Sequence, residues 1–160
     1  MMEQNRFIIL TGDIRSGKTT ALKEWLERHP NARGVVSPDI NGRRHFVYYP
    51  QKELIEMQTT SKEKETIEVG RFLFSKSGFE EVNQRLITDA DRLESEWLVI
   101  DEIGSLELKG KGLFPTLEYL LSQNHYKVII VVRSKLLKQI TDQFGLSMAK
   151  VIFKEELAAI

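Results

Sequence analysis

The sequence predicts an α/β protein with a mostly parallel sheet that is flanked by helices. Short apolar runs of strand composition alternate with segments whose apolar residues recur at helical intervals, and this alternation is typical of a parallel sheet covered by helices. The first apolar run leads through a glycine-containing turn directly into a helical pattern. With 160 residues, of which 41% are hydrophobic, the chain can bury the core of one ordinary domain. We therefore expect a single domain over residues 1–160.

Four apolar runs are expected to form strands of this sheet. The strands of a parallel sheet are buried on both faces, so in a sequence they are continuous apolar runs and not alternating ones. The runs with this character are Phe7–Leu10, Trp97–Ile100, Lys127–Val132 and Val151–Phe153.

Four helices are expected beside these strands, because each segment places apolar residues on one side of a helix. The first runs from Lys18 to about Arg28 and stops before Pro30. The second begins with Ser77 and Glu80, which have the spacing of a capping box. The apolar positions of the last three helices are Phe79, Val82, Leu86, Ala90 and Leu93, then Leu113, Leu117, Leu120 and Leu121, then Leu136, Leu137, Ile140 and Phe144.

The region between the first two helices departs from this alternation. Two β-prone stretches surround Asn41-Gly42, a pair that supplies the positive φ angles of a tight hairpin, so we expect an antiparallel excursion over residues 34–50. The next segment, residues 51–65, is polar and dense in charge, and it is expected to be a mobile surface loop or a short exposed helix. Strand composition resumes at Thr66–Phe74.

Charge and composition exclude several classes of function. Lys plus Arg and Asp plus Glu number 23 each, so no net charge attracts nucleic acid or an acidic membrane surface. With no cysteine, the chain has no disulfide, no thiolate nucleophile and no thiolate metal site. No apolar run has the length of a membrane span or the flanks of a signal peptide. We expect a soluble, cytoplasmic protein, most simply a monomer.

The turn after the first predicted strand, TGDIRSGKTT, contains the pattern G-x-x-x-x-G-K-[ST] of a phosphate-binding loop (P-loop). Such a loop points backbone N–H groups at a polyphosphate, and the following helix directs the positive end of its dipole at the same phosphates. Lys18 adds a full charge near the β- and γ-phosphates, and the Thr19 hydroxyl is placed to ligate Mg²⁺. The residues expected to bind the nucleotide are Gly12, Asp13, Ile14, Arg15, Ser16, Gly17, Lys18, Thr19 and Thr20.

A second functional element follows the predicted strand Trp97–Ile100, which ends in two adjacent carboxylates, Asp101 and Glu102. Open α/β sheets bind ligands at the carboxyl ends of their strands. We expect Asp101 to hold Mg²⁺ through Thr19 or through a metal-bound water, and Glu102 to accept a proton from a water aligned on the γ-phosphate. The sequence contains no Asn-Lys-x-Asp segment of the kind that reads guanine in signalling GTPases.

Arg133 is the arginine expected to neutralise charge on the departing phosphate, because it follows an apolar strand at the expected edge of the site. Arg43 and Arg44 in the hairpin are rivals for this role, and for any one of the three an ordinary surface charge is the simpler interpretation. The histidines are scattered without ligand-like spacing, so no metal is assigned to them. These residues alone support a P-loop phosphohydrolase or phosphotransferase.

Four segments carry a resemblance to a known family: GDIRSGKTT, GVVSPDINGRRHFV, VGRFLF followed by GFEEV, and VIDEIGSLEL. They resemble the small cancer-related, or THEP-type, nucleoside-triphosphatases (NTPases) over most of the chain. The resemblance implies the three-layer sandwich of P-loop NTPases. It also implies Mg²⁺-dependent hydrolysis of the terminal phosphate of ATP, GTP and other nucleoside triphosphates, with little preference among bases.

The chain also differs from the family pattern. It has Arg15 where the family usually has a glycine, and Ser105 and Leu106 where relatives tend to have a lysine and a methionine. Glu107 belongs to the shared last segment, where it either orients water or the loop or caps local backbone.

Three functions are compatible with these observations. The first is a slow, base-tolerant nucleoside triphosphatase. The second is a P-loop kinase that transfers the γ-phosphate to a nucleotide or another small acceptor bound by residues 34–65, although Arg43, Arg44 and Arg71 are few for the arginine-rich lid of such enzymes. The third is a nucleotide-dependent switch that acts on a protein partner.

Overall fold

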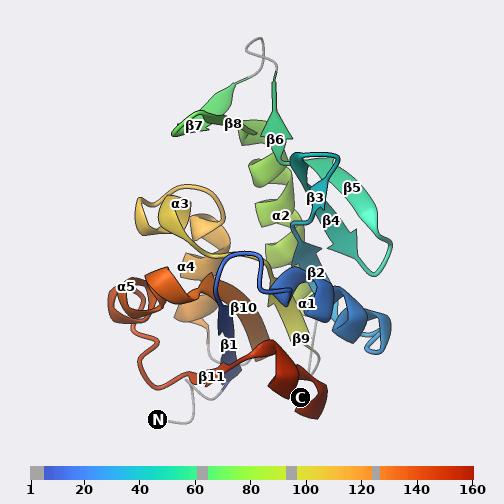
Figure 1. Ribbon diagram of the computed structural model, residues 1–160, viewed down its shortest axis with the longest axis vertical. Coiled ribbons are helices and arrows are strands. Elements are labelled where there is room, and N and C mark those ends of the chain that lie inside the picture. The colour runs from blue at the N-terminus through green and yellow to red at the C-terminus, as the bar shows by residue number, and fades with distance from the viewer. Residues whose placement is uncertain (1–5, 61–64, 93–96, 124–126) are drawn as a thin grey trace.

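A computed structural model describes residues 6–60, 65–92, 97–123 and 127–160 and shows helices on both sides of a central sheet (Figure 1). The strands are β1 (Phe7–Gly12), β2 (Arg33–Val36), β3 (Asp39–Ile40), β4 (Arg43–Tyr49), β5 (Glu53–Glu56), β6 (Gln58–Thr59), β7 (Thr66–Val69), β8 (Phe72–Ser75), β9 (Trp97–Ile100), β10 (Lys127–Arg133) and β11 (Lys150–Ile152). The α-helices are α1 (Lys18–Glu27), α2 (Lys76–Arg92), α3 (Ser105–Leu108), α4 (Phe114–Ser122) and α5 (Leu137–Gln143), and two 3₁₀ helices are η2 (Ser134–Leu136) and η3 (Lys154–Ala159).

The main sheet has the strand order β11-β1-β10-β9-β2-β4-β3, with β5 paired to β4. The pairs from β11 to β2 are all parallel, which confirms the predicted parallel core and its four predicted strands. Strand β2 is also part of this sheet, as a parallel neighbour of β9. The sequence analysis had grouped the residues of β2 with the hairpin. Val35 and Val36 of β2 are fully buried, so this short strand belongs to the core and not to an excursion.

Each face of the sheet is covered by its own apolar cluster. On one face, Leu22 and Trp25 of α1 and Leu157 of η3 pack against the sheet. On the other face, α2, α4 and α5 contribute residues such as Leu86, Leu117 and Ile140 to a second cluster. The two clusters produce the predicted three layers, because each amphipathic helix buries its apolar side on the sheet.

The predicted hairpin is present. Asn41 and Gly42 have φ angles of 55° and 82° and form the turn between β3 and β4, as the Asn-Gly pair predicts. Strand β4 then runs antiparallel to β2, so the excursion is joined edge to edge with the parallel core.

The prediction for residues 51–65 is wrong over the part that the structure describes, since residues 61–64 lie outside it. This segment contains β5, which pairs with β4, and β6, which pairs with β8. Alternation along the chain buries Ile55 (6% exposed) and Thr59 (6% exposed), and these inward-facing positions give a polar segment a strand conformation. A second sheet, β6-β8-β7, lies beyond the first turn of α2 (Figure 1).

Two helices begin differently from the prediction. Helix α2 begins at Lys76, and its N-terminus is capped by Ser75, whose Oγ accepts a hydrogen bond from Gly78 N at 3.1 Å. The predicted capping box at Ser77 and Glu80 is therefore wrong, and Leu93 lies outside the described residues. The fourth predicted helix starts with the 3₁₀ turn η2 that contains Leu136, followed by α5.

No helix within the described ranges is both long and apolar enough to cross a membrane.

Candidate active site

The P-loop connects β1 to α1 and arches over the carboxyl end of β1 (Figure 1). Its closing residue, Gly17, has φ 90° and immediately precedes the first turn of α1. A Cβ atom on Gly12 would lie 2.7 Å from Ser16 Oγ, so any larger residue there would displace the Ser16 side chain. The sequence motif therefore folds as the strand–loop–helix unit that it predicts.

Arg15 lies at the exposed tip of this loop with φ 59°, in the left-handed region that favours glycine. This is the position at which the resembling family usually has a glycine. Holding a side chain in this conformation costs about 1–3 kcal/mol. The loop keeps its geometry here in spite of the arginine, because the bonds of Lys18 and the start of α1 fix both of its ends.

Lys18 lies inside the loop, with 6% of its surface exposed. Its Nζ donates to the carbonyl oxygens of Gly12 (3.1 Å) and Asp13 (2.6 Å) and to Ser16 Oγ (3.3 Å). Burial lowers the pKa of Lys18 below its ordinary value, and the negative charges of Glu102 and Asp101 oppose that shift. The ammonium group therefore lies inside the P-loop, among three oxygen atoms of loop residues.

The two sequence motifs meet at Asp101, which is fully buried at the end of β9. Thr19 Oγ1 donates to Asp101 Oδ2 at 2.8 Å, and Ser37 N donates to the same oxygen at 3.1 Å. Ser37 Oγ also donates to the Asp101 carbonyl at 2.7 Å. Burial, followed by the charge of Glu102, raises the pKa of Asp101, and the bonds from Ser37 and Thr19 oppose this shift. Thr19 and Asp101, the two residues expected to hold Mg²⁺, are thus in direct contact.

The donor set at this point fits Mg²⁺. In the described part of the chain, no hydrogen-bond donor reaches Asp101 Oδ1, although the atom is buried. A buried carboxylate oxygen without a donor, next to a threonine hydroxyl on a P-loop, offers the hard oxygen ligands that Mg²⁺ prefers. No group of three or more His, Asp or Glu side chains that could hold a metal ion occurs among the described residues.

Glu102 and Arg133 form an ion pair, and both residues line a cavity next to the P-loop. Arg133 Nη2 lies 3.0 Å from Glu102 Oε1, and the two side chains are 37% and 19% exposed. The cavity has a volume of about 250 Å³. It is lined by Ile14, Arg15, Ser16, Gly17, Lys18, Thr19, Thr20, Arg44, Glu102 and Arg133. Of the predicted arginines, Arg133 and Arg44 reach this cavity and Arg43 does not line it.

Gly12 and Asp13 lie at the start of the P-loop and do not line the cavity. Their carbonyl groups accept bonds from Lys18, and the Asp13 carboxylate accepts a hydrogen bond from Ser134 Oγ. Asp13 therefore ties the P-loop to the segment that follows β10.

The sequence analysis missed two residues of this site. The N–H and the hydroxyl group of Ser37 both donate hydrogen bonds to Asp101. The sequence signal for Ser37 was its position as a polar residue immediately after the buried pair Val35-Val36. Lys154 donates to the Ser16 carbonyl at 2.6 Å from the C-terminal η3. No local pattern identifies Lys154, because the contact joins residues 138 positions apart in the chain.

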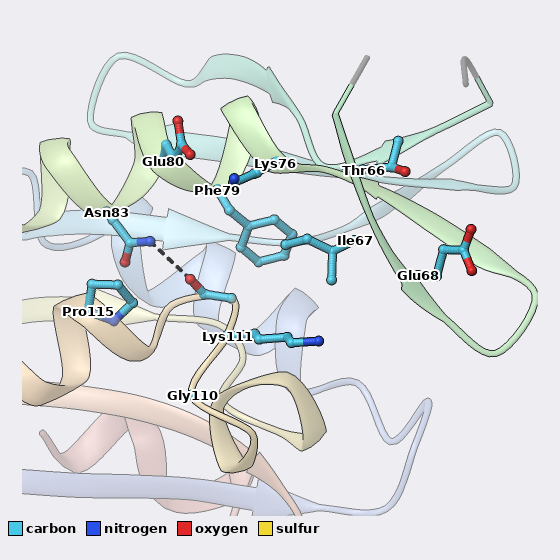
Figure 2. Close-up of a pocket in the computed structure, with 11 residues that line it drawn as sticks. Thr66, Ile67, Glu68, Lys76, Phe79, Glu80, Asn83, Gly110, Lys111 and Pro115 are labelled. Carbon is cyan, nitrogen blue, oxygen red and sulfur yellow. Dashed lines mark hydrogen bonds between the residues drawn. The ribbon is translucent and has the colours of Figure 1, made fainter. Parts of the chain in front are cut away.

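A second, larger cavity has a volume of about 510 Å³ (Figure 2). Phe79 of α2 and Ile67 of β7 face each other inside it, and the loop from Gly110 to Gly112 borders it (Figure 2). None of the residues predicted for nucleotide or metal binding lines this cavity.

Comparisons with known proteins bear on the family and the fold of this chain. A family model described as NTPase matches residues 7–156. The crystal structure of THEP1 from the hyperthermophile Aquifex aeolicus is similar to this chain with a TM-score of 0.72 and 22% sequence identity, over 92% of this chain and 88% of that one. Among curated proteins, none matches this chain. The match over residues 7–156 confirms the resemblance drawn from the sequence: the chain belongs to the NTPase family, and it shares its fold with THEP1.

Proposed function

We propose that this chain hydrolyses the terminal phosphate of nucleoside triphosphates with Mg²⁺, releasing a diphosphate and phosphate. The observation that supports this most is the cavity of about 250 Å³ that unites the P-loop with Glu102 and Arg133. One site then contains groups to bind a polyphosphate, a carboxylate to accept a proton and an arginine to balance charge.

Binding of the triphosphate uses the P-loop backbone and Lys18. The three bonds that Lys18 Nζ donates now go to uncharged oxygens of the loop. Bonds to charged acceptors are roughly twice as strong as bonds to neutral ones, so phosphate oxygens compete well for this ammonium group. The N–H groups at the start of α1 add a field of the same sign.

Thr19 Oγ1 and Asp101 are the side-chain groups that would hold Mg²⁺. When bound there, Mg²⁺ would neutralise the negative charge that develops on the phosphates. Ser37 N donates to Oδ2 of the Asp101 carboxylate and Ser37 Oγ donates to the Asp101 carbonyl, so Ser37 holds both the side chain and the backbone of Asp101.

Glu102 is the proposed general base. Water attacks the γ-phosphorus, its proton passes to Glu102, and the bond between the γ-phosphorus and the β-γ bridging oxygen breaks with the electron pair remaining on the diphosphate. In the structure Glu102 is paired with Arg133. Because a γ-phosphate carries more negative charge than a carboxylate, we expect Arg133 to turn toward the phosphate and release Glu102 to the water.

Transfer of the γ-phosphate to a small acceptor is the alternative. It is supported by Arg44, a residue of the segment expected to bind an acceptor, which lines the cavity and donates to the Ser37 carbonyl at 3.2 Å. Low base selectivity belongs to the proposal as well, because the resemblance to the THEP-type family implies it.

The test is phosphate release from Mg·ATP, Mg·GTP, Mg·CTP and Mg·UTP, measured with and without candidate nucleotide acceptors. Hydrolysis predicts equal amounts of diphosphate and phosphate without an acceptor and similar rates for the four bases. Phosphate that appears only on an added acceptor would replace hydrolysis by transfer. A rate that rises only with a protein partner would favour the switch.

Asp101→Asn is expected to raise the Mg²⁺ concentration that gives half-maximal turnover by at least about tenfold, the size of effect seen when metal-site partners are altered. The change removes the charge beside Thr19 and leaves the shape of the side chain. Titration of Mg²⁺ at saturating ATP measures it. A half-maximal concentration equal to that of the unaltered protein would exclude Asp101 as a ligand.

Arg133→Met is expected to lower kcat about tenfold, which is less than the contribution of a fully engaged arginine, because 37% of the Arg133 side chain is exposed. Arg44→Met is the matched comparison, since both arginines line the same cavity. Steady-state kinetics of the two variants identifies the arginine that acts on the phosphate. A larger loss of kcat in Arg44→Met would transfer the role to Arg44.

A further inference from the structure

A buried carboxylate, Glu107, has no part in the mechanism above. It belongs to α3, the short helix that follows the Asp101-Glu102 pair, and only 3% of its surface is exposed. A carboxylate is rarely buried to this degree unless its oxygens are occupied. Its contacts therefore show what it does.

Each oxygen of Glu107 accepts a hydrogen bond from the backbone. Gly104 N donates to Oε1 at 2.7 Å, and Leu113 N donates to Oε2 at 2.7 Å. Burial raises the pKa of Glu107 to about 7, against the effect of the backbone hydrogen bonds to its carboxylate. Glu107 thus joins the segment that follows β9 to the segment that begins α4.

The bond from Gly104 N is one of three hydrogen bonds that hold the backbone near Glu102, at Asp101, Ile103 and Gly104. Asp101 N donates to Val35 O of β2 at 3.1 Å, and Ile103 N donates to Val131 O of β10 at 2.8 Å. These two bonds hold the residues before and after Glu102 against neighbouring strands. The Gly104–Glu107 bond fixes the next residue, where the chain leaves the sheet and turns into α3.

The loop that contains Leu113, the second donor to Glu107, is itself bonded to helix α2. Asn83 Nδ2 donates to Gly112 O at 2.9 Å, at the edge of the larger cavity (Figure 2). Gly112 has φ 63°, and a Cβ atom on it would lie 2.2 Å from Glu107 Oε2. The backbone of Gly112 therefore lies so close to the Glu107 carboxylate that a side chain at position 112 would collide with it.

We propose that Glu107 is a positioning residue for Glu102: its buried carboxylate binds Gly104 to the α2-anchored segment at Leu113 and so holds the turn that presents Glu102 to the terminal phosphate. This inference rests on the proposed function. It assigns Glu107 no contact with substrate.

Glu107→Gln tests the proposal, because an amide offers one acceptor and places its NH₂ group against the other backbone N–H. Measured at pH 8, above the Glu107 pKa of about 7, kcat is expected to fall about tenfold, a fraction of the ~100-fold that a 1 Å misplacement can cost. KM and the Kd for Mg·ATP are expected to stay unchanged, since the P-loop is intact. Amide hydrogen exchange at Gly104 is expected to become faster.

Tyr48→Phe is the matched control. It removes one hydrogen bond of a buried side chain, from Tyr48 Oη to Asp89 Oδ2 of α2 at 2.8 Å, and leaves the bonds of Glu107 and the Asn83–Gly112 bond in place. We expect it to lower the unfolding midpoint and to keep kcat. Equal losses of kcat in the two variants, or an unchanged kcat in Glu107→Gln, would overturn the proposal.

Gly112→Ala provides a second variant if Glu107→Gln does not fold. Its methyl group displaces the carboxylate from the opposite side, so a loss of kcat at constant KM is expected again, and a kcat equal to that of the unaltered protein contradicts the proposal. If the unaltered protein releases no phosphate, the proposed function fails. Hydrogen exchange at Gly104 then still decides whether Glu107 holds this turn.

Discussion

Lys18→Met is expected to lower kcat/KM for ATP by about 1000-fold, the upper range for loss of one preorganised donor to a charged transition state. The ammonium group lies at the centre of the P-loop, where it bonds three loop oxygens, and methionine keeps its length without its charge. Both the triphosphate and the more highly charged transition state lose this partner. Binding of Mg·ATP by calorimetry and phosphate release together measure the effect.

The same substitution is not expected to unfold the protein. Burial opposes the charged form of Lys18, as its lowered pKa indicates, so removing the charge also removes a desolvation cost. Lys138→Met is the control for loss of a lysine charge, since Lys138 is 88% exposed and pairs with Asp142 on the surface of α5. Unchanged ATP binding in Lys18→Met, with a normal unfolding midpoint, would show that the cavity at the P-loop is not the nucleotide site.

Glu102→Gln is expected to slow hydrolysis by at least about 100-fold while Mg·ATP binding stays within about twofold, because a general base acts on the water and not on the nucleotide. The amide keeps the size of the side chain but accepts no proton. It also ends the ion pair with Arg133, which frees that arginine for the phosphate. The expected signature is therefore tight binding with little turnover.

Single-turnover phosphate release separates this result from slow product release. Glu118→Gln, an exposed position on α4, controls for the loss of one carboxylate. A Glu102→Gln variant that cleaves ATP at the rate of the unaltered protein would remove Glu102 from the mechanism. Since Asp101 is fully buried and bonded to Thr19 and Ser37, it would not be a simple substitute as base.

The parts of the fold that were predicted correctly are those in which local pattern and burial agree. The strands β1, β9 and β10 are apolar runs in the sequence and are buried on both faces in the structure. The hairpin turn at Asn41-Gly42 was predictable because positive φ angles are a local requirement.

The errors occurred where a partner distant in sequence decides the conformation. Residues 51–65 are polar enough overall to suggest a loop, yet β4 pairs with residues 53–56 and Ile55 enters the core. Ser75 and not Ser77 caps α2, because β8 ends immediately before the helix and leaves Ser75 at its N-terminus.

By itself, the sequence determined the α/β class, the P-loop and the identity of the residues at the carboxyl ends of β1 and β9, because these depend on hydrophobic periodicity and on local backbone requirements. Only the tertiary structure decided that Ser37 fixes the Asp101 carboxylate, that Arg133 pairs with Glu102 and that Glu107 spans from Gly104 to Leu113. The physical reason is that parallel pairing brings the ends of β1, β2, β9 and β10 to one edge of the sheet, and strand order is a property of long-range packing that no local pattern encodes.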